Sequence, residues 1–427
     1  MGIVSDIKAE LLLFHSSTKK GGPMPRSTLF PYVLFFSICF ATGCGPISEP
    51  VWNYDSRSFF HTRSDGSVAQ YDLDKKASRV LLAAGEQRPR SVALGPTVPA
   101  VAFAQAAMGA EAGAVQVGLY SLLNSETSWS KLQIWGDAKA RRDLCSASCY
   151  YCPTGKRILI WYHTDNPLNM KNETDWLGRF AVYEVENNKL MELTAPPAML
   201  LAQGAHVSPM CPDGSGYLAM KLNKDNEPQF LFVDWDGWEY PLETDLENAS
   251  RTFAQGNRDA EGVAKAEHCF PLPQGIWSGQ VLRCPIPQGV IAFDLKARRI
   301  KNEPLTESQK KEFDQIFAYD AADRPWTTIQ TSSFEQGRYA LHCRLKMDDD
   351  ARPARIELVD GQLQRRRVLL EGTVPEFFLV HHLFPSPDRR LILACLLVDH
   401  RAWIHVIQSD GQIVAKVDCG PFQMGAK

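Results

Sequence analysis

The sequence predicts an all-β protein made of seven repeated units, each a sheet of four short antiparallel strands. The clearest unit runs from Val380 to Gly420, with turn signals at Pro385–Asp388 and at Asp410-Gly411. Its expected strands are Val380–Phe384, Arg390–Asp399, Arg401–Ser409 and Gln412–Asp418. Asp-Gly between two β-rich runs favours a type I′ hairpin, because both residues tolerate a positive φ. Such a unit cannot bury both of its faces alone, and similar units recur along the chain. Radial closure of the repeats would hide every face, so we expect a seven-bladed β-propeller, with six or eight blades as alternatives.

The third strand of each unit is the easiest to recognise, as a β-rich run around one central residue. The seven central residues are Tyr71, Tyr120, Tyr183, Val233, Phe293, Leu358 and Ile407. They lie 49 to 65 residues apart in the sequence. A β-rich second strand precedes each of them, beginning at Ser58, Ala100, Arg157, Gly216, Gly279, Tyr339 and Arg390. Fourth strands follow, for example at Ser78, Lys189 and Arg366. For the innermost strand of the first unit the only candidate is Val51–Asp55, which leaves the closure of the ring open.

A short turn precedes the second strand in three units. It reads Cys152-Pro153-Thr154-Gly155, Cys211-Pro212-Asp213-Gly214 and Ser386-Pro387-Asp388-Arg389. This pattern resembles the Ser-Pro-Asp-Gly signature of TolB-type, WD-like propeller repeats, and the resemblance covers nearly all of residues 51–420. The pattern is missing from the first, second and sixth units. The resemblance implies protein–protein interaction or scaffolding as the function.

The N-terminal region has the parts of an export signal. Met24-Pro25-Arg26 precedes the apolar run Leu29–Phe40, which ends in Ala41-Thr42-Gly43-Cys44. This ending resembles the lipobox of bacterial lipoproteins, with Ala41 where leucine is more usual. The resemblance implies that Cys44 receives the lipid and becomes the mature N-terminus. An ordinary cleaved signal and an uncleaved anchor are the alternatives.

The expected organisation therefore has four parts. Residues 1–23 would be an upstream extension, with Met24 as the true start, and residues 24–43 the signal peptide. Residues 44–50 would be a tether, and residues 51–427 the propeller. The longest apolar run after residue 50 is Leu391–Val398, which is too short to span a membrane.

Two insertions interrupt the repeats. The polar segment Thr244–Glu267 is expected to form a long surface loop. The segment Thr306–Phe317 has a Thr-x-x-Gln capping box and apolar residues with helical spacing, and predicts a short external helix. Surface loops accept insertions at little cost, so tolerated insertions are the simpler interpretation, with partner contacts as the alternative.

The composition is that of a globular protein and argues against a nucleic-acid partner. The 427 residues are 44% hydrophobic and 22% charged, with a formal net charge of −3. Binding of nucleic acid would require a concentrated basic face. No Gly-x-Ser-x-Gly, His-Glu-x-x-His or phosphate-binding Gly-Lys-Ser/Thr motif is present. Most of the ten tryptophans fall on predicted strands, which fits core packing better than a sugar-binding platform.

The cysteines Cys145, Cys149 and Cys152 have the spacing of the cluster motif of radical SAM enzymes. That family uses an α/β barrel, and the absence of strand–helix alternation here excludes it. Nine cysteines remain after Cys39 and Cys44, so a complete set of disulfides is excluded for a monomer. A local bridge among Cys145, Cys149 and Cys152 is compatible with export. The second-strand cysteines Cys284, Cys343 and Cys395 are expected to be small buried hydrophobes.

Three histidines recur at one position of the repeat. His206, His268 and His382 each stand three residues before a proline, in the expected innermost strand. Equivalent positions of that strand converge on the central channel, and three imidazoles suffice for a zinc-type site with an open position. Alternatively, each histidine forms hydrogen bonds that fasten neighbouring blades. The recurrence with the repeat favours this structural role, and hence no cofactor.

The sequence as a whole predicts an exported, lipid-anchored propeller of the cell envelope that binds a protein partner at the membrane surface. A propeller hydrolase or lyase, or a small-ligand sensor with a His-lined metal site at the channel mouth, is the alternative. No catalytic residue is predicted, because no acidic partner for the histidines is identifiable. Fold alone does not decide between these classes.

Overall fold

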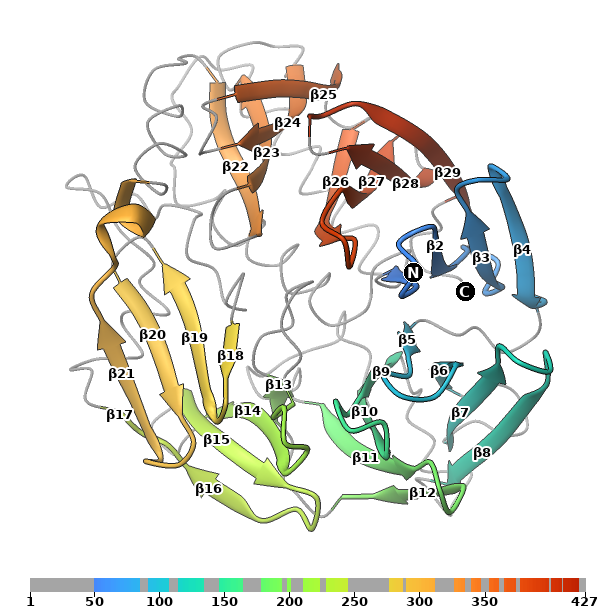
Figure 1. Ribbon diagram of the computed structural model, residues 1–427, viewed down its shortest axis with the longest axis vertical. Helices are drawn as coiled ribbons and strands as arrows, with labels where there is room; N and C mark the ends of the chain where they lie inside the picture. The colour runs from blue at the N-terminus through green and yellow to red at the C-terminus, as the bar shows by residue number, and fades with distance from the viewer. Residues whose placement is uncertain are drawn as a thin grey trace, which may run out of the picture.

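Seven antiparallel sheets form a closed ring, in chain order from blade 1 to blade 7 (Figure 1). The computed structural model describes residues 50–84, 91–106, 114–133, 146–163, 178–193, 198–200, 210–222, 228–244, 276–286, 289–311, 326–334, 339–346, 353–360, 365–373, 377–398, 401–408 and 410–421. Within each sheet the strands follow the sequence from the channel outward. The prediction of seven four-stranded blades is confirmed.

The first three blades have these strands, from the centre outward. Blade 1 contains β1 (Val51–Trp52), β2 (Ser58–Thr62), β3 (Val68–Asp72) and β4 (Ala77–Leu82). Blade 2 contains β5 (Ser91–Leu94), β6 (Ala100–Ala106), β7 (Ala114–Ser121) and β8 (Thr127–Gln133). Blade 3 contains β9 (Ser146–Tyr151), β10 (Arg157–His163), β11 (Arg179–Glu184) and β12 (Lys189–Glu192).

The other four blades repeat the pattern. Blade 4 contains β13 (Met199–Leu200), β14 (Gly216–Leu222), β15 (Pro228–Asp234) and β16 (Glu239–Pro241). Blade 5 contains β18 (Ile276–Ser278), β19 (Val281–Ile286), β20 (Gly289–Asp294) and β21 (Arg299–Glu303), and β17 (Glu243–Thr244) pairs in parallel with β21 outside it. Blade 6 contains β22 (Trp326–Phe334), β23 (Tyr339–Lys346), β24 (Pro353–Asp360) and β25 (Arg365–Thr373). Blade 7 contains β26 (Phe377–Pro385), β27 (Leu391–Val398), β28 (Arg401–Gln408) and β29 (Ile413–Pro421). Every predicted second and third strand occupies its expected place.

The hydrophobic core lies in the seams between blades rather than within them. Successive side chains of a strand point to opposite faces, so each blade packs against both of its neighbours. In β10, Leu159 and Trp161 pack with residues of blade 4, whereas Ile158 and Ile160 pack with residues of blade 2. Similar clusters fill the seams between blades 1 and 2, blades 4 and 5, and blades 7 and 1. The near-continuous apolar runs of the second strands follow from burial on both faces.

The ring closes where blade 7 meets blade 1, and each of these two blades keeps its own four strands. The Trp52 indole N–H donates to the carbonyl of Phe384 at 2.7 Å, and Ser64 N–H donates to the carbonyl of Cys419 at 2.8 Å. An apolar cluster that includes Phe59, Tyr71 and Ile404 fills the seam. The short strand β1 therefore is the innermost strand that the sequence left in doubt, and side-chain packing closes the ring.

One predicted hairpin has a different geometry. The Gln408 N–H donates to the Gln412 carbonyl at 2.8 Å, which closes a three-residue loop. Within the loop, Gly411 N–H donates to the Gln408 carbonyl at 2.8 Å. Of the Asp410-Gly411 pair, only Gly411 has a positive φ, 89°. A type I′ turn needs positive φ at both central residues, so the type I′ prediction is wrong. The geometry is that of a three-residue loop with a glycine bulge.

The predicted capping box is present. Gln309 N–H donates to Thr306 Oγ1 at 3.2 Å, and Thr306 N–H donates to Gln309 Oε1 at 3.0 Å. Residues 307–311 are helical, and the remainder of the predicted helix lies outside the described residues. Most of the predicted loop Thr244–Glu267 also lies outside them.

Candidate interaction surface

The predicted metal site cannot be assembled from the residues that the structure describes. His206 and His268 lie outside the described residues, and so does the proposed lipidation site Cys44. His382 is on the innermost strand β26, paired with Cys395 of β27, and its side chain is outside the described part. Within the described ranges, no group of three His, Cys, Asp or Glu side chains is placed to hold a metal ion. The zinc-type site therefore stays a prediction.

The described cysteines are buried free thiols. Cys284 and Cys395 are 0% and 1% exposed, as predicted, and the side chain of Cys343 is not described. Cys149 packs toward blade 2 and Cys152 toward blade 4, so no bridge joins them. Cys145 lies outside the described residues. Burial raises the pKa of the Cys149 thiol to about 12, which makes it a poor nucleophile at neutral pH.

One face of the ring carries the turns between first and second strands and between third and fourth strands of every blade. This follows from the antiparallel order of four strands, which puts these two turns at the same end of a blade. We call this side the turn face. The recurrent turn predicted from Pro-Asp-Gly lies on this face, between the innermost and the second strand of the blades that have it.

The recurrent turn has one geometry in four blades. Its fourth residue has a positive φ and donates its N–H to the carbonyl of the first residue, at 2.8 to 3.1 Å. These fourth residues are Ser56 (φ 55°), Gly155 (72°), Gly214 (72°) and Arg389 (60°). Blade 1 thus forms the turn as Asn53-Tyr54-Asp55-Ser56, without the sequence pattern. The Asp55 carboxylate accepts hydrogen bonds from Arg57 N–H at 2.8 Å and Ser58 N–H at 3.2 Å, which stabilises the turn.

Neighbouring turns contact one another around this face. Asp388 N–H of blade 7 donates to Ser56 Oγ of blade 1 at 3.1 Å. The Tyr54 hydroxyl of blade 1 donates to the Gly95 carbonyl of blade 2. Gln280 Nε2 of blade 5 donates to Asp213 Oδ2 of blade 4 at 2.8 Å. These bonds join the turns of blades 7 and 1, of blades 1 and 2, and of blades 4 and 5.

Several large exposed apolar side chains lie in turns on the turn face. Tyr54, Val98 and Leu123 are 55%, 41% and 82% exposed, and all three are in turns of blades 1 and 2. Their turns are joined by the Tyr54–Gly95 bond and by Leu122 N–H, which donates to the Pro99 carbonyl at 2.8 Å. We call Tyr54, Val98 and Leu123 the blade 1–2 patch. Trp238, 69% exposed, is on the same face in blade 4.

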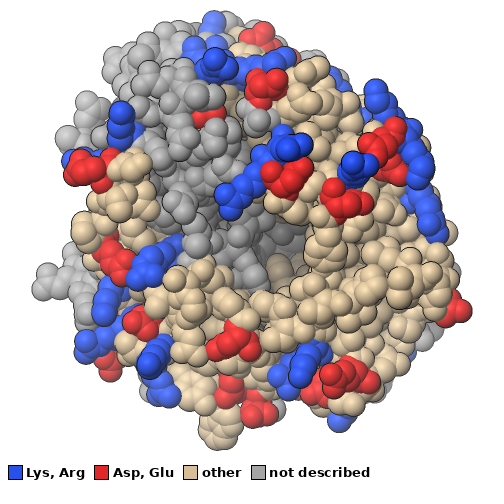
Figure 2. All heavy atoms as spheres, in the orientation of Figure 1, with Lys and Arg blue, Asp and Glu red and all other residues tan. Residues whose placement is uncertain are grey.

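Among the residues that the structure describes, charged side chains of both signs are interspersed (Figure 2). On the side shown in Figure 2, basic and acidic side chains alternate around the ring. In the turns of blade 1, Lys75 pairs with Asp72 at 2.8 Å and Arg57 with Asp74 at 3.4 Å. Such a surface offers no concentrated attraction for a polyanion.

Blade 6 buries a charged cluster that the sequence did not reveal. Glu357, 1% exposed, lies 3.5 Å from Arg344 and 3.9 Å from Arg366, and it also contacts Arg355. Arg344 is fully buried. Alternating charged positions on β24 look like a solvent face in the sequence, so no local signal distinguishes this cluster from a surface.

The fold defines the chain as a seven-bladed β-propeller. Among solved structures it is similar to TolB from Acinetobacter baumannii, at 10% sequence identity and a TM-score of 0.34, over 89% of this chain. The chain spans 64% of that TolB chain, slightly less than two thirds of its length. It is also similar to the Dos1 propeller, at 10% identity and a TM-score of 0.39, over 82% of this chain and 75% of the other.

The seven four-stranded sheets confirm the predicted propeller fold. No protein-family model matches the chain, and no curated protein matches it. Because the structural likeness is distant, the propeller assignment rests on the seven sheets themselves. In the described ranges, no helix has the length and apolar character required to cross a membrane.

Proposed function

We propose that this chain is a lipid-anchored β-propeller of the cell envelope that binds a protein partner through its turn face. The blade 1–2 patch is the observation that carries the proposal. Exposed large apolar side chains that share a rigid surface are typical of binding sites, and aromatic residues are enriched in interface cores. The interlocked turns support this role, because a rigid surface loses little conformational entropy on binding.

The chemistry of the turn face favours a protein over a nucleic acid as the partner. Its charges have both signs and are paired locally, as for Lys75 with Asp72. Apolar side chains and exposed turn backbone suit a partner that presents apolar side chains among polar groups. We therefore expect binding that changes little with salt concentration.

Charged substitutions within the patch test the interaction. Partners of the full-length protein are captured from the membrane fraction of the source cells and quantified by mass spectrometry. We expect Val98→Glu and Leu123→Glu to deplete the same partner at least about tenfold, because each buries a charge in the interface. Val368→Glu is the matched control, since Val368 is 39% exposed on the outer strand of blade 6. A partner that is depleted equally by all three substitutions, or by none, contradicts the proposal.

The lipid anchor is tested separately. The proposal rests on the Ala41-Thr42-Gly43-Cys44 motif and predicts that Cys44 carries the lipid. Intact-mass measurement should show a mature chain that begins at Cys44 with an added diacylglyceryl group, and Cys44→Ala should release the protein from membranes. An unmodified chain, or a Cys44→Ala variant that remains at the membrane, contradicts the lipid anchor and leaves the patch test intact.

A further inference from the structure

The first strand of blade 1 fixes the direction from which the chain enters the ring. β1 pairs antiparallel with β2, with Val51 opposite Phe60. The chain passes from β1 into the Asn53–Ser56 turn on the turn face, so Pro50 lies on the other side of Val51. Pro50 is buried, which holds this entry point within the ring. The N-terminal end of β1 is therefore directed toward the side opposite the turn face.

We call this opposite side the anchor face. The turns between second and third strands lie on it, and in blade 1 this turn is Arg63–Ser67. Arg63 N–H donates to the Ser67 carbonyl at 2.8 Å, and the exposed Asp65 at the tip accepts from Ser67 N–H at 2.8 Å. The turn follows β2, the strand that pairs with β1. It therefore marks the rim of the anchor face next to the start of β1.

The length of chain between Cys44 and Val51 limits how far the ring can stand from a lipid at Cys44. These seven residue steps span at most about 25 Å when fully extended. Val51 is level with Phe60, and the three steps from Phe60 to Arg63 rise about 10 Å to the rim of the anchor face. Cys44 can therefore reach at most about 15 Å beyond that rim.

The same length argues against an exit through the turn face. A reversal of the chain requires a turn of four residues, which leaves about three of residues 44–50 to run back beside β1. Three extended residues cover about 10 Å, the rise from Val51 to Tyr54 in the first turn. A chain that reversed would end level with the turns and would have no length left to clear them.

We propose that the anchor face lies against the headgroup surface of a lipid bilayer, with the turn face directed away from the membrane. The inference rests on the proposed lipid at Cys44, and it deepens the proposed function by defining the side from which the partner approaches. Leu123 follows β7, whose eight residues extend about 26 Å from the anchor face to the turn face. The blade 1–2 patch therefore meets a protein surface in the aqueous compartment, outside the bilayer.

Charges on the anchor face give little independent attraction to lipid. Arg401 begins β28, and its Nε donates to Asp418 near the end of β29 at 3.1 Å. Arg179 begins β11 and lies 3.3 Å from Glu192 at the end of β12. Locally paired charges attract anionic headgroups far less than a polybasic segment does. We therefore expect the contact to depend on the lipid at Cys44 and to change little with salt concentration.

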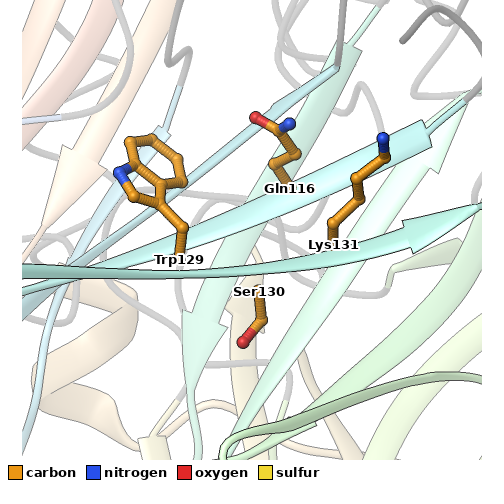
Figure 3. A pocket seen from close by; sticks show the side chains of 4 residues that line it. All are labelled: Gln116, Trp129, Ser130 and Lys131. Carbon is orange, nitrogen blue, oxygen red and sulfur yellow. The ribbon is translucent and has the colours of Figure 1, made fainter.

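The outer wall of blade 2 provides a third height, between the two faces. β8 runs from Thr127 at the turn face to Gln133 at the anchor face. Figure 3 shows its central residues around an open pocket of about 240 Å³: Gln116, Trp129, Ser130 and Lys131. Trp129 is 42% exposed, an exception to the expectation that tryptophans on strands pack in the core. Lys131 is also exposed and is a suitable position for a probe on this wall.

Quenching by lipids that carry a nitroxide headgroup measures the orientation. The lipidated full-length protein is added to preformed phosphatidylcholine vesicles, so that it inserts from outside, and intact mass confirms the lipid. A fluorescent amino acid is placed at Asp65, Lys131 or Leu123. We expect quenching at Asp65 to exceed quenching at Leu123 at least about threefold, because about 25 Å of strand separates them, with Lys131 between.

Two variants test whether the tether sets the orientation. Insertion of twenty Gly/Ser residues after Ser48 adds a flexible chain with a root-mean-square length of about 25 Å, which should bring quenching at Asp65 down to the level at Leu123. Cys44→Ala should abolish quenching at all three positions. Quenching at Asp65 that persists in either variant would show that the face binds lipid by itself, and would overturn the role of the tether.

The outcomes separate this inference from the proposed lipid anchor. A lipidated chain with equal quenching at Asp65 and Leu123, or with stronger quenching at Leu123, overturns the orientation and leaves the anchor standing. A mature chain whose intact mass shows no lipid at Cys44 overturns both. Binding of a protein partner to the blade 1–2 patch is measured without vesicles and is independent of either result.

Discussion

At the scale of single residues, Glu357 shows how a buried carboxylate holds a blade together. It is 1% exposed and forms ion pairs with Arg344 at 3.5 Å and Arg366 at 3.9 Å. Removing one member of a buried ion pair leaves the other charge in a medium of low dielectric constant, which is far more costly than losing an exposed pair. Glu357 lies at the register shift between β24 and β25, so the same substitution also disturbs an irregular part of the sheet.

We expect Glu357→Ala to lower the free energy of unfolding by about 3–5 kcal/mol. The matched control is Glu303→Ala, which removes a cross-strand pair with Arg283 at 2.8 Å whose two side chains are 37% and 41% exposed. The control should cost less than about 1 kcal/mol, because water screens an exposed pair. Urea denaturation followed by circular dichroism measures both. Equal losses in the two variants would show that the blade 6 cluster has no special role.

Two buried histidines make stability depend on pH. Burial lowers the pKa of His61 to about 4, and burial together with the nearby Lys416 lowers that of His405 to about 4. The unfolded chain therefore binds more protons than the folded chain between about pH 6.5 and pH 4. Stability should be full above pH 6.5, fall as the pH drops toward 4, and level off below that, by an amount on the order of 3 kcal/mol for each histidine.

Substitution of His61 isolates its part of this pH dependence. His61 is fully buried, 3.6 Å from Cys419 Sγ in the seam between blades 7 and 1. His61→Phe keeps an aromatic ring and has no titrating group. Urea denaturation at pH 7.5 and pH 4.5 should show a smaller loss of stability for the variant than for the native chain. An identical loss in both proteins would assign the pH dependence to other groups.

Predictions about single residues were confirmed where they depend on a local sequence pattern. Cys284 and Cys395 are buried free thiols, and the Thr306 capping box is formed, because both depend on neighbours close in sequence or on strand position. The burial of Glu357 and the exposure of Trp129 depend on which face of a strand meets the next blade. That choice is set by packing between units distant in sequence, so no local pattern reveals it.

At the scale of elements, the recurrent turn joins neighbouring blades as well as neighbouring strands. Asp213 Oδ1 accepts from Ser215 N–H at 2.9 Å, and Asp213 Oδ2 accepts from Gln280 Nε2 of the next blade at 2.8 Å. Burial raises the pKa of the Asp213 carboxyl, but the hydrogen bonds from Ser215 and Gln280 outweigh it and leave the pKa below its usual value. The turn thus stabilises its own geometry and the seam between blades 4 and 5.

A double-mutant cycle between Asp213 and Gln280 measures the contact between blades. We expect Asp213→Ala to cost about 1–2 kcal/mol, because it removes hydrogen bonds to a charged acceptor, and Gln280→Ala to cost less. The two substitutions should be non-additive by about 0.5–1 kcal/mol, as expected for residues in contact. Additive losses, measured by urea denaturation of the two single variants and the double variant, would show that the bond does not couple the blades.

Strand prediction succeeded for long strands and was weakest for short ones. The second and third strands carry five to eight residues with strong β character, and all of them occupy their predicted places. The innermost strands β1 and β13 contain only two residues each, too few to show a period of two. The Asp410-Gly411 turn was assigned the wrong type because a three-residue loop and a two-residue loop carry the same dipeptide signal.

At the scale of the whole molecule, the number of blades followed from the repeat, but the closure of the ring did not. Blade 1 supplies all four of its own strands, and the seam with blade 7 is closed by packing and by bonds such as Trp52 to Phe384. Contacts across more than 300 residues leave no trace in local sequence. The strand order within a blade puts the turns of Val98 and Leu123 at the same end of blade 2, and the packing of blade 1 against blade 2 adds the turn of Tyr54.

The predicted histidine site remains open to a direct measurement. The recurrence of His206, His268 and His382 with the repeat favours a role in fastening blades, so we expect purified protein to contain no stoichiometric metal. Elemental mass spectrometry is run on the native chain and on a variant with all three histidines changed to alanine, with folding checked by circular dichroism. About one zinc per chain that disappears in a folded variant would contradict this expectation and would favour the enzyme alternative.

Site-specific photo-crosslinking in the source cells tests the central claim, that the turn face binds a protein, most directly. A photoreactive phenylalanine analogue is placed at Leu123, 82% exposed in the blade 1–2 patch, or at Val368, 39% exposed on the outer strand of blade 6. We predict a discrete adduct with one partner protein from position 123 and none with that partner from position 368. Adducts that are absent from position 123, or that are the same from both positions, would contradict binding through the turn face.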